Sequence, residues 1–573
     1  MSIQFINGTA PIYFDYTAPK PEPVHTQRSF FIYVGDHAFA NYDEAMADAS
    51  RIGLKEIVDE HGANLVIVNP ASGSWETDTA EDASRMMAAL IALLKEKGEG
   101  YVWYWQRDLI TMVGNRRGAD YISTYLAAAF PAATVMEGFF LKLMAQSVTL
   151  LHPTCAPGDT SRYIPEATGK LLPAFIAGGS AEAIEGYKKL NRVGAESEQK
   201  LGCTCYESTE KNATVAICDT VDADTLRRAY ELVQSTYRRR NLGDEPLASV
   251  RRPNLSQIGV TKIEHNEYLD PQNPDMLYTW YEYLPDDIAE GERLPLMMVC
   301  HGGGENGQYI MEMTRWAFLV REERVICAAM TNHSIEKDSI LLTHLLKTLP
   351  IDESRCYATG FSMGGVSSSG VGLVDSRFAG VAPQDGVTFS VERFAPEKMP
   401  IFYISGINDS PFPTVSREVP EGGSAPRLGN HAGNGLQGPP PPSDAQQAAR
   451  KAPAAVRMRM PSPLTLNSVA EVLNCYFAKN GISFRYWSPL QFTEETGKFG
   501  VQLQNVFTVT DTIGGHVFTV GDLPSDDGEV LVRLAHISGL GHDVHPNTAR
   551  LVWDFLKQFR RLPDGTLDCC NAR

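Results

Sequence analysis

The sequence predicts an α/β protein with two tandem domains, each a mostly parallel sheet flanked by helices. Strand-like and helix-like segments alternate along the 573-residue chain, which is typical of parallel strands joined by crossover helices. Runs such as 294–299 are apolar throughout, as expected of strands buried on both sheet faces. The chain is also too long for a single hydrophobic core, so we expect two or more domains.

The second half, 251–573, has the clearer series of elements. Apolar or alternating runs predict its strands, and small-residue or amphipathic runs predict its helices. The predicted strands cover 259–265, 278–283, 294–299, 325–329, 356–359, 379–382, 399–405 and 529–535. The predicted helices cover 339–348, 362–374 and 548–559.

The first half, 1–250, follows the same plan. Its predicted strands cover 30–34, 64–68, 109–114, 133–138 and 213–217, with a helix over 121–130. We match 133–138 to 378–382, and 213–217 to the strand that ends at Ser405. The alternative is an unrelated α/β domain that carries similarly spaced glycines by chance.

Two segments lack the patterns of regular structure. The segment 237–253 contains an arginine cluster and is the predicted linker between the domains. The segment 411–463 is rich in proline and glycine, a composition that cannot hold a helix or a central strand. We expect a long loop or a flexible lid there, and favour the lid.

Composition limits the possible partners and location. The formal charge of −18 opposes nucleic-acid binding, which selects for basic surfaces. The sequence contains no run of eighteen apolar residues, so we expect no membrane span. Residues 1–20 lack the basic start and apolar core of a signal peptide. We therefore expect a cytoplasmic protein, or a secreted or periplasmic one if the chain starts at a mature N-terminus.

The ten cysteines do not form a recognisable disulfide framework. Cys203 with Cys205 and Cys569 with Cys570 are the suggestive pairs, but neither has a second pair at zinc-site spacing. A disulfide there is more expected if the protein is exported. Nucleotide-binding G-x-x-x-x-G-K-[ST] and zinc-binding H-E-x-x-H motifs are absent from the sequence, and we expect no metal and no cofactor.

The stretch Gly360-Phe361-Ser362-Met363-Gly364 is a candidate nucleophile elbow, a strained turn that presents a serine between a strand and a helix. The flanking glycines suit such a turn because it packs too tightly for side chains. A serine that merely caps a helix would not explain both glycines. Ser362 is therefore the predicted nucleophile.

A serine nucleophile needs a base, and the base needs a carboxylate to orient it. Both should follow the serine along the chain, the acid first. Asp409 follows a strand through a short turn and is the predicted acid, with Asp385 and Asp511 in reserve. The predicted base is His542, which lies in a glycine-flanked turn before the last helix, and His545 is the second choice.

The developing negative charge on a substrate oxygen needs two backbone N–H donors. We expect one from Met363, directly after the nucleophile. The second should come from the glycine-rich turn after the strand 294–299, from Gly303 first and Gly304 second. His301, at the start of this turn, should brace it rather than act as a base.

The first half lacks this machinery. Arg116 stands where the second half has Ser362, and a guanidinium stays protonated and cannot accept an acyl group. After Arg116, the only histidine of this half is His152, far from a closing strand. We expect the first half to pack against the active domain, form a homo-oligomer surface, or shape the active-site mouth.

Four motifs together resemble the polyhydroxybutyrate-depolymerase-like esterases, a group that includes feruloyl and acetyl-xylan esterases. They are His301-Gly302-Gly303-Gly304, Gly360–Gly364, Asp409 and Gly539-Leu540-Gly541-His542. The resemblance covers about 255–560 and implies serine ester hydrolysis in an α/β-hydrolase domain. The expected substrate is a small, aryl or polyester-type ester. A serine peptidase of the same fold and a non-catalytic scaffold remain alternatives.

Overall fold

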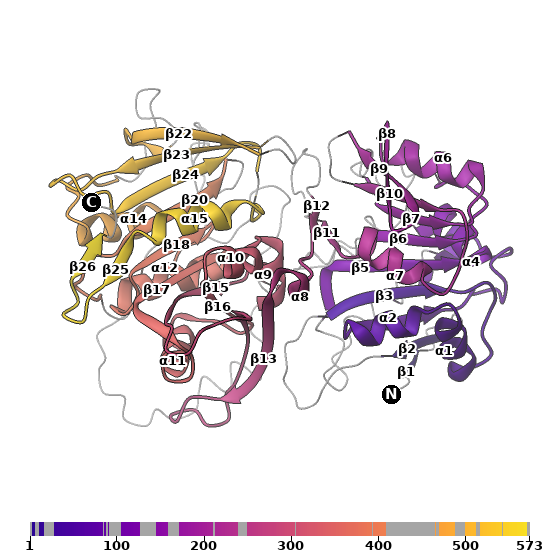
Figure 1. Ribbon diagram of the computed structural model, residues 1–573, viewed down its shortest axis with the longest axis horizontal. Helices are drawn as coiled ribbons and strands as arrows, with labels where there is room; N and C mark the ends of the chain where they lie inside the picture. The colour runs from indigo at the N-terminus through magenta and orange to yellow at the C-terminus, as the bar shows by residue number, and fades with distance from the viewer. Residues whose placement is uncertain are drawn as a thin grey trace, which may run out of the picture. The chain divides into compact units, whose positions relative to one another are not determined.

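Figure 1 shows a computed structural model of the chain. Among the described residues, those up to Arg252 form one compact unit and those from Pro253 onward form a second. The structure describes residues 3–5, 11–15, 28–83, 85–86, 90, 105–126, 145–158, 171–209, 213–238, 249–303, 305–391, 394–407, 464–465, 469–486, 499–511, 516–540 and 542–569.

The second unit is built on a ten-stranded sheet in the order β13-β14-β16-β15-β17-β18-β20-β24-β23-β22. The strands from β16 to β24 in this order pair in parallel, and those at both edges pair antiparallel. The strand bounds are β13 Val260–Tyr268, β14 Leu277–Pro285, β15 Leu294–Cys300, β16 Ile326–Met330, β17 Ile351–Phe361, β18 Gly380–Gln384, β20 Ile401–Gly406, β22 Gln504–Thr510, β23 Val517–Leu523 and β24 Val532–Ile537.

Helices cover both faces of this sheet. Successive residues of β15 point to opposite faces, so Leu296 and Met298 join one core cluster, while Met297 and Val299 join another. Residues of α11, α12 and α14 belong to the first cluster, and residues of α9, α10 and α15 to the second. The helix bounds are α8 Leu255–Ile258, α9 Gly307–Met313, α10 Trp316–Glu322, α11 Ile335–Thr348, α12 Met363–Val374, α14 Val469–Lys479 and α15 Thr548–Leu556.

Two short antiparallel pairs complete the second unit. One joins β19 (Ser390–Val391) to β21 (Leu464–Thr465), and the other joins β25 (Phe559–Arg561) to β26 (Leu567–Cys569). The second pair begins three residues after α15 ends, so this last helix is shorter than the predicted 548–559.

The first unit has a ten-stranded sheet in the order β1-β2-β4-β3-β5-β6-β7-β10-β9-β8. The run from β4 to β10 in this order pairs in parallel. The strand bounds are β1 Ile3–Phe5, β2 Ile12–Asp15, β3 Arg28–Val34, β4 Asn64–Val68, β5 Trp105–Asn115, β6 Ala145–Leu151, β7 Ala174–Ala177, β8 Val193–Lys200, β9 Cys203–Ser208 and β10 Thr214–Cys218.

Among the described residues, the helices of the first unit are shorter on average, and two of them continue as π-helical turns. Their bounds are α1 Tyr42–Arg51, α2 Leu54–Glu60, α4 Arg117–Tyr121 with η1 Ile122–Leu126, α6 Ala181–Leu190, and α7 Thr225–Ala229 with η4 Tyr230–Gln234. At the end of the unit, the antiparallel strands β11 (Thr236–Arg238) and β12 (Ser249–Arg251) pair, and both overlap the predicted linker 237–253. The predicted lid, 411–463, lies outside the described residues.

The two sheets have the same strand order, position by position, so β5 corresponds to β17 and β3 to β15. The α/β-hydrolase order expected from the sequence is therefore present in each sheet. The matching of later strands differs from our expectation. The counterpart of β18 is β6, and 133–138 lies outside the described residues. The strand β10, which contains 214–217, corresponds to β24 and not to β20. In each unit, two antiparallel edge strands come before the last parallel strand in the chain.

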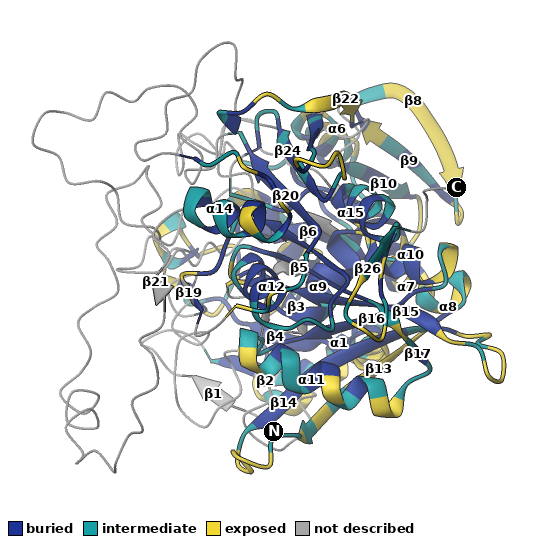
Figure 2. Cartoon of the chain, turned by 90° about the vertical axis from the view of Figure 1, so that its left-hand side faces the viewer, coloured by how far each residue is buried: buried dark blue, intermediate teal, exposed yellow. Residues whose placement is uncertain are grey.

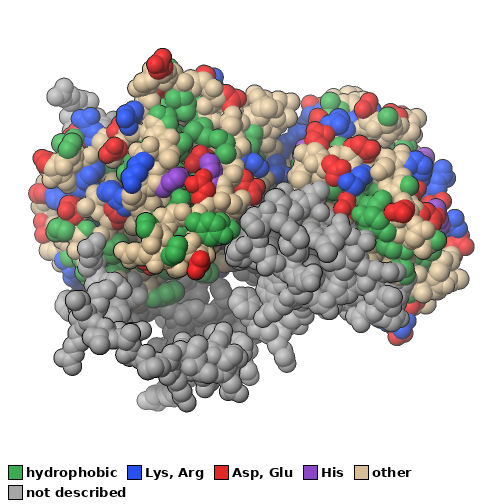
Figure 3. Space-filling model, turned by 90° about the horizontal axis from the view of Figure 1, so that it is seen from below, with side chains coloured by type: hydrophobic (Ala, Val, Ile, Leu, Met, Phe, Trp, Pro, Cys, Tyr) green, Lys and Arg blue, Asp and Glu red, His purple; other side chains and the backbone are tan. Residues whose placement is uncertain are grey.

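Burial follows this layered plan. Figure 2 shows buried central strands, whereas β8 and β13 at sheet edges carry mostly exposed residues. On the face drawn in Figure 3, the described acidic and basic side chains are interspersed rather than segregated. Among the described residues, no helix combines the length and apolar character needed to cross a membrane.

Candidate active site

Ser362 lies between the end of β17 and the start of α12, with a φ of 53° and a ψ of −111°. This conformation is strained for a residue with a side chain and typically costs about 1–3 kcal/mol. A Cβ at Gly360 would lie 2.4 Å from the backbone of Gly364, and a Cβ at Gly364 would lie 2.1 Å from the Cys300 carbonyl oxygen. Both glycines are therefore required by backbone contacts, and the turn has the form of a nucleophile elbow.

His542 approaches this serine from the segment after β24. Its Nε2 lies 2.8 Å from the Ser362 Oγ, although the two residues are 180 positions apart in the chain. Both side chains are half-buried, and the Phe361 ring lies 5.1 Å from the imidazole, centroid to centroid. The structure thus brings the predicted nucleophile and the predicted base within hydrogen-bond distance.

The two predicted oxyanion donors lie on neighbouring segments. Met363 is the first residue of α12, where an amide N–H has no acceptor within its own helix. Gly303 lies in the turn after β15, and a Cβ there would meet the Met363 Sδ at 3.2 Å. The amide of the preceding Gly302 donates to the Glu305 Oε2 at 2.8 Å. Gly304 lies outside the described residues.

His301 is buried at the start of this turn and contacts backbone oxygens on both sides. Its Nε2 lies 2.6 Å from the Thr331 carbonyl oxygen and its Nδ1 lies 2.7 Å from that of Gly302. The ring thus links the turn after β15 to the segment after β16. This placement agrees with a bracing role.

The predicted acid, Asp409, lies outside the described residues, which end at Ile407 after β20. Its relation to His542 therefore stays a prediction. Of the reserves, Asp385 is buried with a φ of 47°, and its Oδ1 accepts the amide of Gly406 at 2.8 Å. That bond ties the end of β18 to the end of β20.

Asp511, the other reserve, contacts His545. Its Oδ2 lies 3.2 Å from the Nε2 of buried His545, and its Oδ1 accepts the Asn547 side-chain amide at 2.7 Å. The His545 Nδ1 accepts the backbone amide of Asn547, so Nε2 carries the proton and donates it to Asp511. This pair fixes the turn before α15.

His333, which we did not single out from the sequence, occupies a central position near the elbow. It follows β16, and its Nε2 donates to the His301 carbonyl oxygen at 2.8 Å while its Nδ1 lies 2.8 Å from the Ser367 Oγ. A signal was available, because His333 and His301 follow neighbouring parallel strands whose carboxyl ends meet at one sheet edge.

Behind this edge, the Cys300 thiol donates to the Asp338 Oδ2 at 3.6 Å. Asp338 is buried, and this burial raises its pKa to about 8, so the carboxyl is largely protonated at neutral pH. Cys300, His333 and Asp338 hold potential metal-ligand atoms within 4.8 Å of one another. However, both His333 nitrogens are engaged in hydrogen bonds, so this trio fits a hydrogen-bonded cluster better than a metal site. The described cysteines, including Cys203, Cys205 and Cys569, are free thiols, and Cys570 is not described.

The first unit has the same elbow backbone with Arg116 in place of a serine. Arg116 has a φ of 49° and a ψ of −116°, and its amide donates to Leu151 at 2.8 Å, as that of Ser362 donates to Gln384. A Cβ at Gly118 would lie 2.1 Å from the Val34 carbonyl oxygen, which repeats the contact of Gly364. The elbow backbone is therefore the same in both units, with an exposed arginine in place of the serine.

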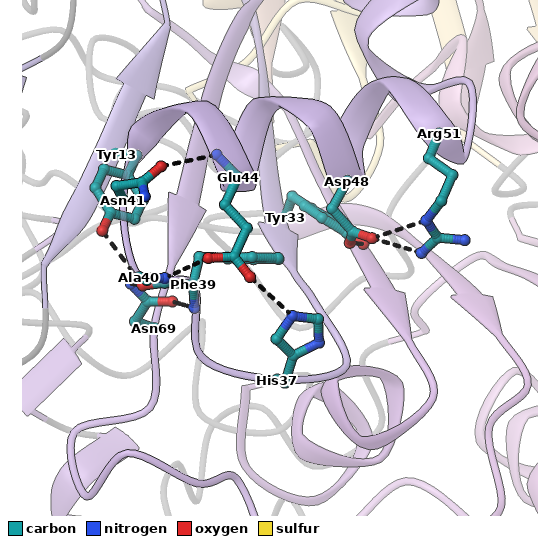
Figure 4. A network of polar contacts seen from close by, with 10 residues as sticks. All are labelled: Tyr13, Tyr33, His37, Phe39, Ala40, Asn41, Glu44, Asp48, Arg51 and Asn69. Carbon is teal, nitrogen blue, oxygen red and sulfur yellow. Dashed lines mark hydrogen bonds and ion pairs between the residues drawn. The ribbon is translucent and has the colours of Figure 1, made fainter.

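The turn after β3 is held from the segment after β4, as Figure 4 shows. The Asn69 Oδ1 accepts the Phe39 amide at 2.9 Å, and its Nδ2 donates to the Phe39 carbonyl oxygen at 3.3 Å. Glu44 in α1 accepts the Ala40 amide at 2.8 Å and lies 3.5 Å from His37. These bonds fix the first unit's counterpart of the glycine-rich turn.

No protein-family model matches the chain. The chain is 28% identical over 140 residues to a bifunctional acetylxylan esterase/xylanase, XynS20E, of Neocallimastix patriciarum, and the match spans 22% of this chain and 21% of that protein. The chain thus spans about a fifth of the length of this curated relative.

Solved structures of esterases show partial similarity. S-formylglutathione hydrolase FrmB from Staphylococcus aureus has 16% identity and a TM-score of 0.23, over 26% of this chain and 78% of that chain. A feruloyl esterase module from Clostridium thermocellum, complexed with sinapinate, has 14% identity and a TM-score of 0.23, over 28% and 73% of the two chains. A thermostable esterase has 21% identity and the same TM-score, over 26% and 47%.

Proposed function

We propose that the second unit is a serine carboxylic ester hydrolase. The observation that carries this proposal is the 2.8 Å contact between the His542 Nε2 and the Ser362 Oγ at a strained strand-to-helix turn. A serine that only caps a helix would not require the strained backbone seen at Ser362. A histidine with only a structural role would not require a contact with that serine hydroxyl. A nucleophile with a base in hydrogen-bond reach is the arrangement that acyl transfer requires.

In the proposed reaction, the Ser362 Oγ forms a bond to the ester carbonyl carbon while His542 takes the hydroxyl proton. The amides of Met363 and Gly303 hold the negative oxygen of the tetrahedral intermediate. When the intermediate collapses, the bond to the leaving alcohol breaks and His542 donates the proton to it. Water then attacks the acyl-enzyme with His542 as base, the bond between the acyl carbon and the Ser362 Oγ breaks to release the acid, and His542 returns the proton to Ser362. Asp409 orients His542 and stabilises its charged form.

An ester is favoured over a peptide for two reasons. The motifs resemble those of esterases, and the 140-residue match is to a protein described as an acetylxylan esterase/xylanase. Met363 is 57% exposed beside the elbow, and its side chain provides an apolar contact for a small acyl or aryl group. The proposed substrate class is therefore a small, aryl or polyester-type ester.

Hydrolysis of p-nitrophenyl acetate and butyrate tests this function against its alternatives. We expect turnover of these esters by the full chain and none by Ser362→Ala. Faster turnover of peptide anilides than of either ester would instead identify a serine peptidase. Absence of turnover with every substrate, together with no labelling by a fluorophosphonate, would identify a non-catalytic scaffold.

For the first unit we propose a non-catalytic role, as a packing or homo-oligomer surface. The support is Arg116, which stands at the elbow in place of a nucleophile. Sedimentation of the full chain would measure its oligomeric state, and a strictly monomeric protein would exclude the oligomer role.

A further inference from the structure

We propose that His333 is a positioning residue that ties the oxyanion turn to the nucleophile helix. This inference rests on the proposed ester hydrolysis, because it concerns the two amides that would hold the negative oxygen. Those amides lie on separate segments, one after β15 and one at the start of α12. His333 belongs to neither segment and contacts both.

The hydrogen-bond partners fix one tautomer of His333. A backbone carbonyl oxygen only accepts, so the 2.8 Å contact with the His301 carbonyl oxygen requires a proton on Nε2. In a neutral ring, Nδ1 then keeps its lone pair and accepts the Ser367 hydroxyl at 2.8 Å. Each nitrogen therefore has a definite partner on a different segment.

The ring stays neutral over the pH range in which such a reaction runs. Burial, and next the nearby His301, lower the pKa of His333 to about 3. The His301 ring lies 4.7 Å away in an edge-to-face arrangement, and the Lys337 ammonium disfavours a second positive charge. A protonated ring would donate to the Ser367 oxygen instead of accepting from its hydroxyl, so neutrality fixes the direction of this hydrogen bond.

The link matters because of what lies next to its two ends. His301 comes two residues before Gly303, and Ser367 comes four residues after Met363 on the same helix. The direct packing of Gly364 on the Cys300 carbonyl sets how closely the segments approach. The two His333 hydrogen bonds also fix how the turn after β15 is oriented relative to α12. This orientation matters because an oxyanion donor misplaced by about 1 Å can cost on the order of a hundredfold in rate.

The first unit provides an internal comparison. There Asn69, directly after β4, donates to and accepts from Phe39 in the turn after β3. The strands β4 and β3 correspond to β16 and β15. In both units, a polar side chain after the fourth strand holds the turn after the third. In the second unit, this side chain is His333, and it also contacts α12, the helix after the elbow. Among the described residues, no corresponding contact is seen for Asn69 in the first unit.

Two pairs of variants test the proposal in the full chain. His333→Phe removes both hydrogen bonds, and His333→Gln retains an amide donor and an acceptor. Ser367→Ala removes one bond, and Ser368→Ala is its matched control because the Ser368 hydroxyl, as far as the structure describes the chain, bonds within its own helix to Gly365. We expect kcat to fall by roughly 10- to 100-fold in His333→Phe with little change in KM. His333→Gln should recover part of the loss, and Ser367→Ala should show a smaller loss than His333→Phe.

Two further measurements separate this proposal from the proposed function. Imidazole nitrogen NMR should show a neutral His333 with the proton on Nε2 from pH 8 down to about pH 4. Amide hydrogen exchange over 299–303 should be faster in His333→Phe and Ser367→Ala than in Ser368→Ala. If these two results hold but the wild-type protein hydrolyses no ester, the link stands and the proposed function fails. If the wild type is active and His333→Phe leaves kcat and exchange unchanged, the positioning role is wrong.

Discussion

The Asp36 carboxylate accepts the backbone amide of Arg117, with an Oδ1 to nitrogen distance of 3.3 Å. Arg117 also donates to the same oxygen from its side-chain Nε at 3.1 Å. Because Arg117 directly follows the elbow residue Arg116, its amide corresponds to the Met363 amide of the second unit. In the first unit, a carboxylate therefore contacts the Arg117 amide, which is the counterpart of the proposed oxyanion donor Met363.

The first prediction concerns the nucleophile. Ser362→Ala should lose on the order of a million-fold in kcat, the usual cost of removing the serine of a triad. The half-buried hydroxyl contributes little to packing, so the melting temperature should remain close to that of the wild type. Ester turnover and thermal unfolding are measured on the same preparation. Retention of most of the activity would remove Ser362 from the mechanism.

The second prediction separates the candidate acids. Asp409→Asn should lower kcat by about ten-thousand-fold near neutral pH, because the imidazole then takes the wrong tautomer. Asp511→Asn should affect stability more than kcat, since Asp511 accepts hydrogen bonds from His545 and Asn547 in the turn before α15. Severe loss of kcat in Asp385→Asn, together with a mild effect of Asp409→Asn, would transfer the role to Asp385.

The sequence predicted the central parallel strands well because they are continuous apolar runs. The predicted strands 294–299 and 325–329 agree closely with β15 and β16. Boundaries set by caps were less accurate. The helix α11 begins at Ile335, four residues before the predicted start, because the Ser334 side chain accepts the Lys337 amide and caps it.

The pair Ser362 and His542 was predictable because motif glycines mark both turns. His333 was not predicted, because it lies in no motif and its signal, a place after the strand that pairs in parallel with the one before His301, depends on knowing the strand pairing. The matching of 213–217 to the strand that ends at Ser405 was wrong, because it also depended on strand pairing.

The strands β8 and β9 of the first unit, and β22 and β23 of the second, come before the last parallel strand in the chain. Each parallel strand therefore cannot be matched to its counterpart by counting strands along the sequence.

The third prediction concerns the pH dependence of stability. Burial raises the pKa of Asp338 to about 8, whereas an unfolded aspartate titrates near about 4. Between these values the folded state binds more protons, so the free energy of unfolding should fall as pH rises through this window. The effect is at most about 1.4 kcal/mol for each pH unit.

Thermal unfolding of the wild type and of Asp338→Asn from pH 5 to about pH 8 measures this effect, as a difference in slope. Asp338→Asn should flatten the pH dependence whatever its effect on the absolute stability. The carboxyl faces the Cys300 thiol and, from its own helix, Lys337. Equal slopes in the two proteins would show that Asp338 is ionised in the fold at neutral pH.

The last prediction concerns the first unit. Fluorophosphonate labelling of the full chain should map to the peptide that carries Ser362 and to no peptide of 1–250, because Arg116 offers no nucleophile. Arg116→Ser would place a hydroxyl on the same strained backbone, yet it should remain unlabelled. One reason is Asp36, whose negative oxygen contacts the Arg117 amide and would repel a second anion there. The other reason is the lack of a base, since His152 follows β6, the counterpart of β18, and not β10, the counterpart of the strand before His542. The double variant Arg116→Ser with Asp36→Gly separates the two causes. If it also stays unlabelled, the missing base is sufficient to explain the inactivity, whereas labelling of Arg116→Ser alone would show that the first unit retains a working site.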